Sequence, residues 1–302
     1  MTAAPDDRGA GRTVLVTGAS SGIGRSTAHV LAAQGARLVL AARSEESLER
    51  TRQECVGRGA GDVLVVPTDV GVRERVDVLF DAAAERFGRV DAVVHAAAVL
   101  AYGLFEDVPA DVFDRILTTN VVGTTNVARR ALLQFEKQEG GSLVVVGSVI
   151  AKIATPYMSS YATSKWAVHG LVRTLQIEAR AKKDVHVSLV SPGGVDTPIY
   201  DLAGSYTGRP GHPPPPVVPP ERVARAVVSA LDRPAREISV GPANLLMVAG
   251  FRLLPGVYDA LVTPMMRLLG QGRGSVEPGS GNVFEAQPDK EAVHGRWPHF
   301  WG

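Results

Sequence analysis

Tyr161 and Lys165 are four positions apart in the stretch SSYATSK. On a helix, this spacing places two side chains one turn apart on the same face. A free tyrosine has a pKa near ~10, and an ammonium group ~4–6 Å away favours the phenolate and lowers that pKa. A tyrosine with a pKa closer to the working pH can act as a general acid or base. The pair therefore predicts proton transfer at a substrate oxygen, with a lowered pKa for Tyr161.

A glycine-rich turn near the N-terminus predicts a site for a nucleotide phosphate. The apolar run 13–17 is typical of a buried strand, and Gly18, Gly22 and Gly24 follow it before a helical pattern over 25–34. Glycines allow the backbone to approach a phosphate, and the helix N-terminus offers free N–H groups. The order of strand, turn and helix fits a dinucleotide fingerprint, although the spacing is Gly-x-x-x-Gly-x-Gly. The alternative is a glycine-rich loop without a ligand.

The end of the next predicted strand, 36–42, indicates which dinucleotide is bound. A residue about 20 positions past the glycine turn meets the adenosine ribose, and a carboxylate there accepts the 2′-hydroxyl of NAD. This chain has Ala42 followed by Arg43, which lacks the carboxylate and supplies a guanidinium suited to a phosphate. The pattern favours NADP(H). The alternative is that Arg43 is a solvated charge and Glu45 serves the ribose of NAD(H).

Short apolar runs alternate with helical patterns as far as residue 241, which predicts an α/β fold. Such alternation gives a doubly wound parallel sheet between two helix layers, an α/β/α sandwich. Ligands bind beyond the carboxyl ends of the strands. Asp69, Ala96, Ser148 and Pro192 all lie at such ends. Strands are expected over 13–17, 36–42, 63–67, 90–95, 142–146, 185–190 and 237–240, and helices over 25–34, 45–56, 73–87, 112–135, 161–181 and 221–231.

Together, in this order and spacing, these elements resemble the short-chain dehydrogenase/reductase family, which has a Rossmann-like fold. The resemblance implies that Tyr161 is the catalytic acid or base and that Ser148 stabilises charge on the same substrate oxygen. It implies that Lys165 lowers the pKa of Tyr161 and holds the nicotinamide ribose. Asn120 would position a water that carries protons from Lys165 to solvent. No metal is expected.

The resemblance also implies which residues contact the cofactor. Asp69 and Val70 would lie at the adenine, and Val195 and Thr197 would orient the nicotinamide carboxamide. The full set of expected cofactor contacts is Gly18, Ser20, Ser21, Gly22, Ile23, Gly24, Arg43, Ser44, Asp69, Val70, Ala96, Ala97, Tyr161, Lys165, Pro192, Gly193, Val195 and Thr197.

One segment departs from the family pattern. The family usually has Asn-Asn-Ala-Gly after the fourth strand, whereas this chain has His95–Ala96–Ala97–Ala98. The missing asparagine normally ties strands together, so the departure bears on local stability and cofactor fit. His95 either replaces that hydrogen bond or is a satisfied strand-end histidine, and we favour the second.

The chain divides into an N-terminal arm over 1–12, expected to be disordered, a dehydrogenase domain over 13–241 and an extension over 242–302. The Pro- and Gly-rich segment 196–220 is expected to be a substrate lid, with Tyr200 and Tyr206 as candidates to line the pocket. Segment 242–270 is apolar. We favour its packing over the pocket or a subunit interface, and peripheral contact with a membrane is the less favoured alternative. The polar remainder, 271–302, is expected to be loose.

Composition limits the partners. The 302 residues include 32 Lys and Arg and 31 Asp and Glu, so the chain has almost no net charge and no overall positive potential that would attract nucleic acid. Cys55 is the sole cysteine, and the N-terminus lacks the apolar core of a signal peptide, so we expect a cytoplasmic protein. We expect a homodimer or homotetramer formed through the helices over 112–135 and 161–181.

The predicted function is hydride transfer between NADP(H) and a carbonyl or secondary alcohol, with a bulky and hydrophobic substrate. The first alternative is an NAD-linked dehydrogenase of the same fold. The second is a dinucleotide-binding protein without catalysis.

Overall fold

A parallel sheet of seven strands forms the centre of the molecule, in the computed structural model that describes residues 11–299. The strand order is β3-β2-β1-β4-β6-β7-β11, and all neighbouring strands run parallel. This confirms the predicted doubly wound fold; most of the N-terminal arm, residues 1–10, lies outside the described residues. The strands are β1 Thr13–Thr17, β2 Arg37–Ala42, β3 Asp62–Pro67, β4 Ala92–His95, β6 Gly141–Val146, β7 Val185–Pro192 and β11 Ile238–Val240.

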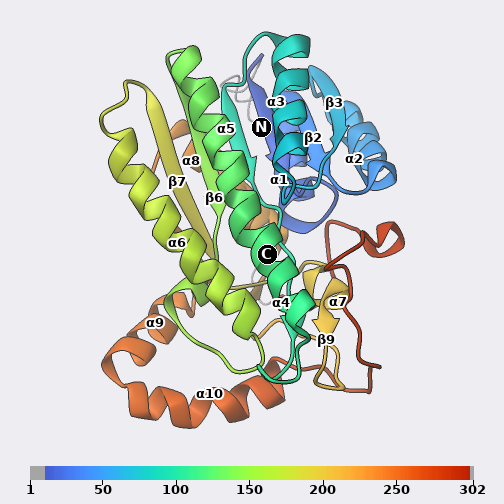
Figure 1. The fold of residues 1–302 in the computed structure, drawn as a ribbon, viewed down its shortest axis with the longest axis vertical. Coiled ribbons are helices and arrows are strands. Elements are labelled where there is room, and N and C mark those ends of the chain that lie inside the picture. The colour runs from blue at the N-terminus through green and yellow to red at the C-terminus, as the bar shows by residue number, and fades with distance from the viewer. Residues whose placement is uncertain (1–10, 300–302) are drawn as a thin grey trace, which may run out of the picture.

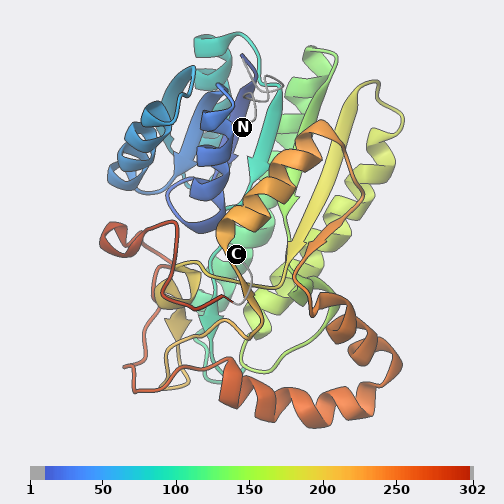
Figure 2. The same ribbon diagram turned by 180° about the vertical axis from the view of Figure 1, so that it is seen from behind.

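Helices cover both faces of this sheet (Figures 1 and 2). One face packs on α1 (Gly22–Ala33), α2 (Glu45–Gly57) and α8 (Pro220–Asp232), and the other on α3 (Arg73–Phe87), α5 (Gly123–Lys137) and α6 (Ser159–Ala179). Strand residues alternate between the two cores: Val14 and Val16 join the first, and Leu15 joins the second. This is the period of two that a strand imposes on its side chains.

The predicted long helix over 112–135 is interrupted. It consists of α4 (Ala110–Leu117), a π-helical turn over Thr118–Val122 and then α5. Asn120 lies in the π-helical turn, and its carbonyl accepts a hydrogen bond of 2.6 Å from Thr124 Oγ1. Such turns are rare and occur often at functional sites.

Short elements and two further helices gather beyond the carboxyl ends of the strands (Figure 1). Among residues 11–299, no helix has the length and apolar character needed to cross a membrane. The additional elements are β5 Ala101–Tyr102, β8 Gly194–Val195, α7 Ile199–Leu202, β9 Gly204–Ser205, β10 Val217–Val218, α9 Asn244–Leu253 and α10 Pro255–Leu269, with single 3-10 turns at Val149–Lys152 and Pro288–Lys290.

The C-terminal segment after α10 is held against the domain as far as residue 299, which differs from the loose end we expected (Figure 2). Val283 is fully buried in a small apolar cluster that includes Val99 and Val112. The Asn282 amide donates to the Leu202 carbonyl at 2.8 Å. The segment therefore returns from α10 to the edge of the domain.

Candidate active site

Tyr161 and Lys165 lie in the first two turns of α6, and both are buried. The Lys165 Nζ atom is 5.5 Å from the centre of the Tyr161 ring and donates to the Val146 carbonyl at 3.2 Å. Val146 is the last residue of β6, so the end of this strand fixes the position of the ammonium group. The predicted pairing of the two side chains on one helix face is therefore present.

The expected lowering of the Tyr161 pKa is wrong. Burial raises the pKa of Tyr161 above its ordinary value, nearby Tyr200 adds to the rise, and a hydrogen bond with Ser148 opposes it. Burial also lowers the pKa of Lys165 to about 8. Desolvation disfavours the charged form of each group, so at neutral pH Tyr161 carries its proton.

Ser148 follows β6 and has two roles. Its Oγ accepts a hydrogen bond of 3.2 Å from the Ile150 amide, which caps the short 3-10 turn that starts at Val149. The Ser148 side chain also forms a hydrogen bond with the side chain of Tyr161. The capping bond fixes the Ser148 rotamer beside Tyr161.

The Asn120 side chain connects the loop at Val99 to α6. Its Oδ1 accepts from the Val99 amide at 2.9 Å, and its Nδ2 donates to the Val99 carbonyl at 2.9 Å and to Ser164 Oγ at 3.0 Å. Ser164 in turn donates to the Tyr161 carbonyl at 2.7 Å. The side chain therefore positions the first turn of α6. Its expected role in holding a water stays a prediction.

The glycine turn forms a cradle that only glycine permits. A Cβ on Gly24 would lie 2.1 Å from the Gly18 carbonyl oxygen, and one on Gly18, whose φ is +69°, would lie 2.7 Å from the Ala97 amide. A cavity of about 140 Å³, here named the turn cavity, lies along this cradle. The expected cofactor contacts that line it are Gly18, Ser20, Ser21, Gly22, Ile23, Gly24, Arg43, Asp69, Val70, Ala96, Ala97 and Thr197.

Ser44 does not line this cavity. Its hydroxyl accepts from the Ser47 amide at 3.2 Å and caps α2. Asp69 does line it, but it already has two partners: an ion pair with Arg115 and a bond of 2.9 Å from the Gly71 amide. Arg115 comes from α4, far away in the sequence, and no local pattern indicated this pairing.

Both ring nitrogens of His95 have a hydrogen-bond partner. Its Nδ1 lies 2.8 Å from Thr17 Oγ1 in β1, and its Nε2 lies 2.9 Å from Thr124 Oγ1 in α5. Burial lowers the pKa of His95 to about 3, so the ring is neutral. His95 thus joins β1, β4 and α5 where the family pattern has an asparagine.

A second cavity of about 410 Å³, here named the apolar cavity, begins at Tyr161, Lys165 and Ser148. It shares Ile23, Ala96 and Thr197 with the turn cavity, so the two are adjacent. Pro192, Gly193 and Val195 line its inner end. Its outer wall is apolar and comes largely from α9 and α10: Leu246, Met247, Leu254, Val257, Leu261, Val262, Met265, Met266 and Leu269.

Three tyrosines show one prediction that is confirmed, one that is wrong and one position that the sequence did not indicate. Tyr200 lines the apolar cavity as expected, whereas Tyr206 packs against the cluster of Val99 and Val112 instead. Tyr102 also lines the cavity and is 1% exposed. Its hydroxyl has no hydrogen-bond partner within residues 11–299. Nothing in the sequence around Tyr102 indicated this position.

The chain matches a known protein family over the part that holds this site. The family model described as short chain dehydrogenase matches residues 12–205, which hold the glycine turn and all four expected catalytic residues. The chain belongs to the short-chain dehydrogenases.

Relatives of this dehydrogenase agree with that assignment. The uncharacterized oxidoreductase YxnA of Bacillus subtilis is 34% identical over 84% of this chain and 72% of its own. The uncharacterized oxidoreductase Lin0452 of Listeria innocua is 31% identical over 76% of this chain and 96% of its own. A short chain dehydrogenase structure from Bacillus anthracis has a TM-score of 0.69 at 22% identity, covering 78% of this chain and 98% of that one, which shows the shared fold. The dehydrogenase is therefore an oxidoreductase of a family that uses a nicotinamide dinucleotide.

Proposed function

We propose that this dehydrogenase reduces the carbonyl group of a bulky apolar substrate with NADPH, and that Tyr161 donates the proton. The observation that carries the proposal is the position of Tyr161, Lys165 and Ser148 at the inner end of an apolar cavity that adjoins the glycine cradle. Proton transfer by Tyr161 and binding of an apolar substrate would therefore occur in the same cavity.

The protonation states favour reduction. Because burial raises the pKa of Tyr161, its hydroxyl is a proton donor at neutral pH. The Ser148 hydroxyl beside it is placed to hydrogen-bond the same carbonyl oxygen and stabilise the charge that develops there. Lys165, with a pKa of about 8, remains largely protonated at neutral pH and favours the phenolate that proton donation leaves behind.

The cradle fits a dinucleotide. Without a Cβ, Gly24 can lie directly against the Gly18 carbonyl, and the amides at the N-terminus of α1 are donors suited to a pyrophosphate. When bound, the nicotinamide supplies the hydride. Val195 and Thr197 would orient it, and Lys165 would hold its ribose. The choice of NADP(H) is supported by Arg43 at the end of β2, where Ala42 replaces a carboxylate.

The substrate class is supported by the walls of the apolar cavity. Its volume of about 410 Å³ falls within the ~300–1,000 Å³ of ligand pockets. Pro214, Pro215 and Pro216 of the proposed lid line it together with residues of α9 and α10. A carbonyl compound with a large apolar body would bury that body there and present its oxygen to Tyr161.

Replacing Tyr161 with Phe tests the mechanism. The variant should lose turnover of apolar ketones by about 10²–10⁴-fold, the usual contribution of general acid catalysis. It should keep its affinity for NADPH, measured by nicotinamide fluorescence. Tyr157→Phe is the control, because its hydroxyl accepts from Arg267 Nε at 2.7 Å outside the cavity. Undiminished turnover in Tyr161→Phe would disprove the role of Tyr161.

A side-by-side titration with NADPH and NADH tests the cofactor. Arg43→Gln should weaken NADPH binding much more than NADH binding, since only NADPH carries the 2′-phosphate. An equal loss of affinity for NADPH and NADH would favour the alternative of an NAD-linked dehydrogenase. Binding of neither dinucleotide to the unmodified chain would support a protein without this catalysis.

Self-association through α5 and α6 is part of the same proposal. Leu133 on α5 and Ile177 on α6 are exposed apolar side chains, 47% and 64% accessible. Burying them against a second copy would remove apolar surface from water. Light scattering of Leu133→Arg should show a smaller particle than that of the unmodified chain.

A further inference from the structure

The segment from Asn282 to Ala292, here named the strap, runs across the edge of the turn cavity. Arg43, the proposed phosphate ligand, donates to three of its carbonyls. Nη2 donates to Asn282 at 2.6 Å, and Nη1 donates to Val283 and Phe284 at 3.1 Å each. The guanidinium that the 2′-phosphate would need is therefore already engaged by oxygen atoms of the chain itself.

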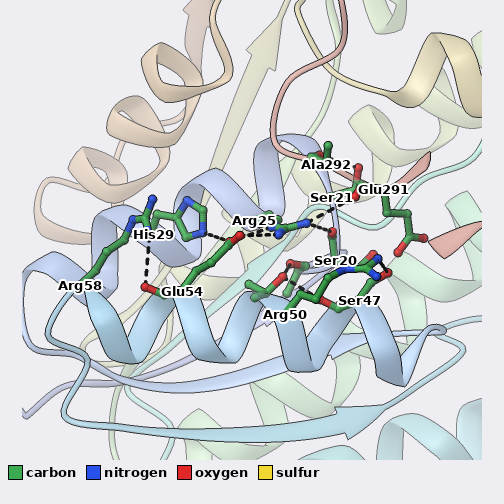
Figure 3. Close-up of polar contacts among 12 residues, drawn as sticks. Ser20, Ser21, Arg25, His29, Ser47, Arg50, Glu54, Arg58, Glu291 and Ala292 are labelled. Atoms are coloured by element: carbon green, nitrogen blue, oxygen red, sulfur yellow. Dashed lines mark hydrogen bonds and ion pairs between the residues drawn. The ribbon is translucent and has the colours of Figure 1, made fainter. Parts of the chain in front are cut away.

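The far end of the strap engages the N-terminus of α1 (Figure 3). The Gly22 amide donates to the Ala292 carbonyl at 2.8 Å, and Ser21 Oγ donates to the same oxygen at 3.0 Å. The Arg25 guanidinium contacts the Glu291 carbonyl at 3.4 Å. The amides at a helix N-terminus are donors suited to an anion, so a carbonyl here uses the kind of donor that a pyrophosphate would use.

Contacts outside the cavity hold the strap in this place. Arg50 donates to the Pro288 carbonyl at 2.7 Å, and the buried Val283 fixes the start of the strap. Beyond it, Asp196 Oδ1 accepts from the Trp297 amide at 2.9 Å. Asp196 precedes Thr197, which lines both cavities. The strap is thus held at both ends, and between them it lies along the turn cavity.

The strap forms part of the wall of the turn cavity, which would hold the adenosine and pyrophosphate end of the cofactor. The volume of this cavity is about 140 Å³ with the strap in place, and Asn282 of the strap lines it. Glu291 lines it, and the Glu291 Oε2 atom is buried without a hydrogen-bond partner among the described residues. A carboxylate in this position repels a phosphate that approaches Arg43.

We propose that the strap competes with NADP(H): cofactor binding requires residues 282–292 to withdraw, and Glu291 sets how strongly the 2′-phosphate is disfavoured. This inference rests on the proposed binding of NADP(H). The apparent dissociation constant then equals the intrinsic one divided by the fraction of molecules whose strap is open. If one molecule in about ten is open, the affinity is about tenfold below that of the open form.

Neutralising the carboxylate tests the role of Glu291. Glu291→Gln should bind NADPH about three- to tenfold more tightly, with a smaller gain for NADH, because NADPH carries the additional phosphate charge. Glu285→Gln is the matched control, since Glu285 is an exposed residue of the strap that does not line the cavity. An equal gain in both variants, or none in Glu291→Gln, would overturn the assigned role.

A reversible crosslink tests the withdrawal. Ser21→Cys combined with Ala292→Cys places thiols where the Ser21 hydroxyl now meets the strap, and Cys55 is buried with its pKa raised to about 12, so it does not interfere. The oxidised protein should bind NADPH at least about tenfold more weakly than the same protein after reduction. The reduced form also controls for the change at Ser21.

The other outcomes of the crosslink experiment are distinguishable. Equal affinity before and after reduction would show that the strap does not need to open, and the inference would be wrong. Tighter binding or slower release in the oxidised protein would make the strap a lid over bound cofactor, which also overturns competition. If Glu291→Gln and the reduced double variant bind neither NADPH nor NADH, the proposed function fails and the inference fails with it.

Discussion

The Nδ1 atom of His95 lies 2.8 Å from the Oγ1 atom of Thr17, which joins the ends of two adjacent parallel strands inside the core. The ring is neutral at pH 7 because burial lowers the His95 pKa to about 3. A histidine in the unfolded chain has a pKa near ~6.5. Between these values the unfolded state binds one more proton than the folded state does.

The stability of the protein should therefore fall as the pH is lowered from about 6.5 towards 3. His95→Asn should be less stable at pH 7 by about 1–3 kcal/mol, because buried hydrogen bonds are lost. It should also depend less on pH within that window. Urea unfolding at a series of pH values measures both effects. The exposed His186→Asn variant is the control and should match the unmodified chain.

Lys165 should lower the stability of the protein, although the proposed mechanism uses it. Its pKa is lowered to about 8, so folding below that pH buries a charge, and the penalty is relieved as the pH rises towards the ordinary value. Lys165→Met should lose most turnover yet gain about 1–3 kcal/mol in unfolding free energy at pH 7. The gain should shrink near pH 10. A loss of stability at pH 7, relative to the exposed control Lys183→Met, would contradict this account.

Gly24→Ala should abolish dinucleotide binding. The new Cβ would lie 2.1 Å from the Gly18 carbonyl, so the turn must open and the amides at the start of α1 must move. Gly170→Ala is the matched change in α6, where nothing lies within 4 Å of the new carbon. That control should keep cofactor binding and gain about 0.5–1 kcal/mol in stability. Fluorescence titration with NADPH and thermal unfolding distinguish the two variants.

The Tyr102 hydroxyl should recognise a second polar group on the substrate. Because that hydroxyl is buried without a partner in the described part of the chain, Tyr102→Phe should stabilise the protein by about 1–2 kcal/mol. It should raise KM for apolar ketones that carry a second hydrogen-bond acceptor and leave KM for simple apolar ketones unchanged. Steady-state kinetics on a matched pair, such as a 3-oxo ester and a 2-alkanone, test this. An equal change in KM for both would exclude the contact.

The sheet and the cradle were predictable because their signals are local. An apolar run such as 13–17, directly before glycines, gives both a strand and a turn. Asn120 was located, but its π-helical turn was not, since the apolar pattern continues through the interruption. The direction of the Tyr161 pKa shift depends on burial and on Tyr200, which is far away in the sequence. Such burial arises only from tertiary packing.

The two parts of the C-terminal extension differ in how far they could be predicted. We favoured packing of segment 242–270 over the pocket or a subunit interface, and the structure places it as the outer wall of the apolar cavity with its other side exposed; Leu245 is 82% accessible. Segment 271–299 has a polar composition rich in Gly and Pro that resembles a loose end. Its position depends on arginines in other elements, which no local pattern relates to it.

The strap also limits what a conventional mutational survey would reveal. In the hydrogen bonds from Arg43, Arg50 and Gly22, the strap accepts through main-chain oxygens. Replacing the side chains of the strap one at a time with alanine leaves those oxygens in place, so such a scan would pass over most of the contact. The same substitutions made on the arginine side would expose it. In a relative, strap residues could therefore diverge widely while the contact itself persists.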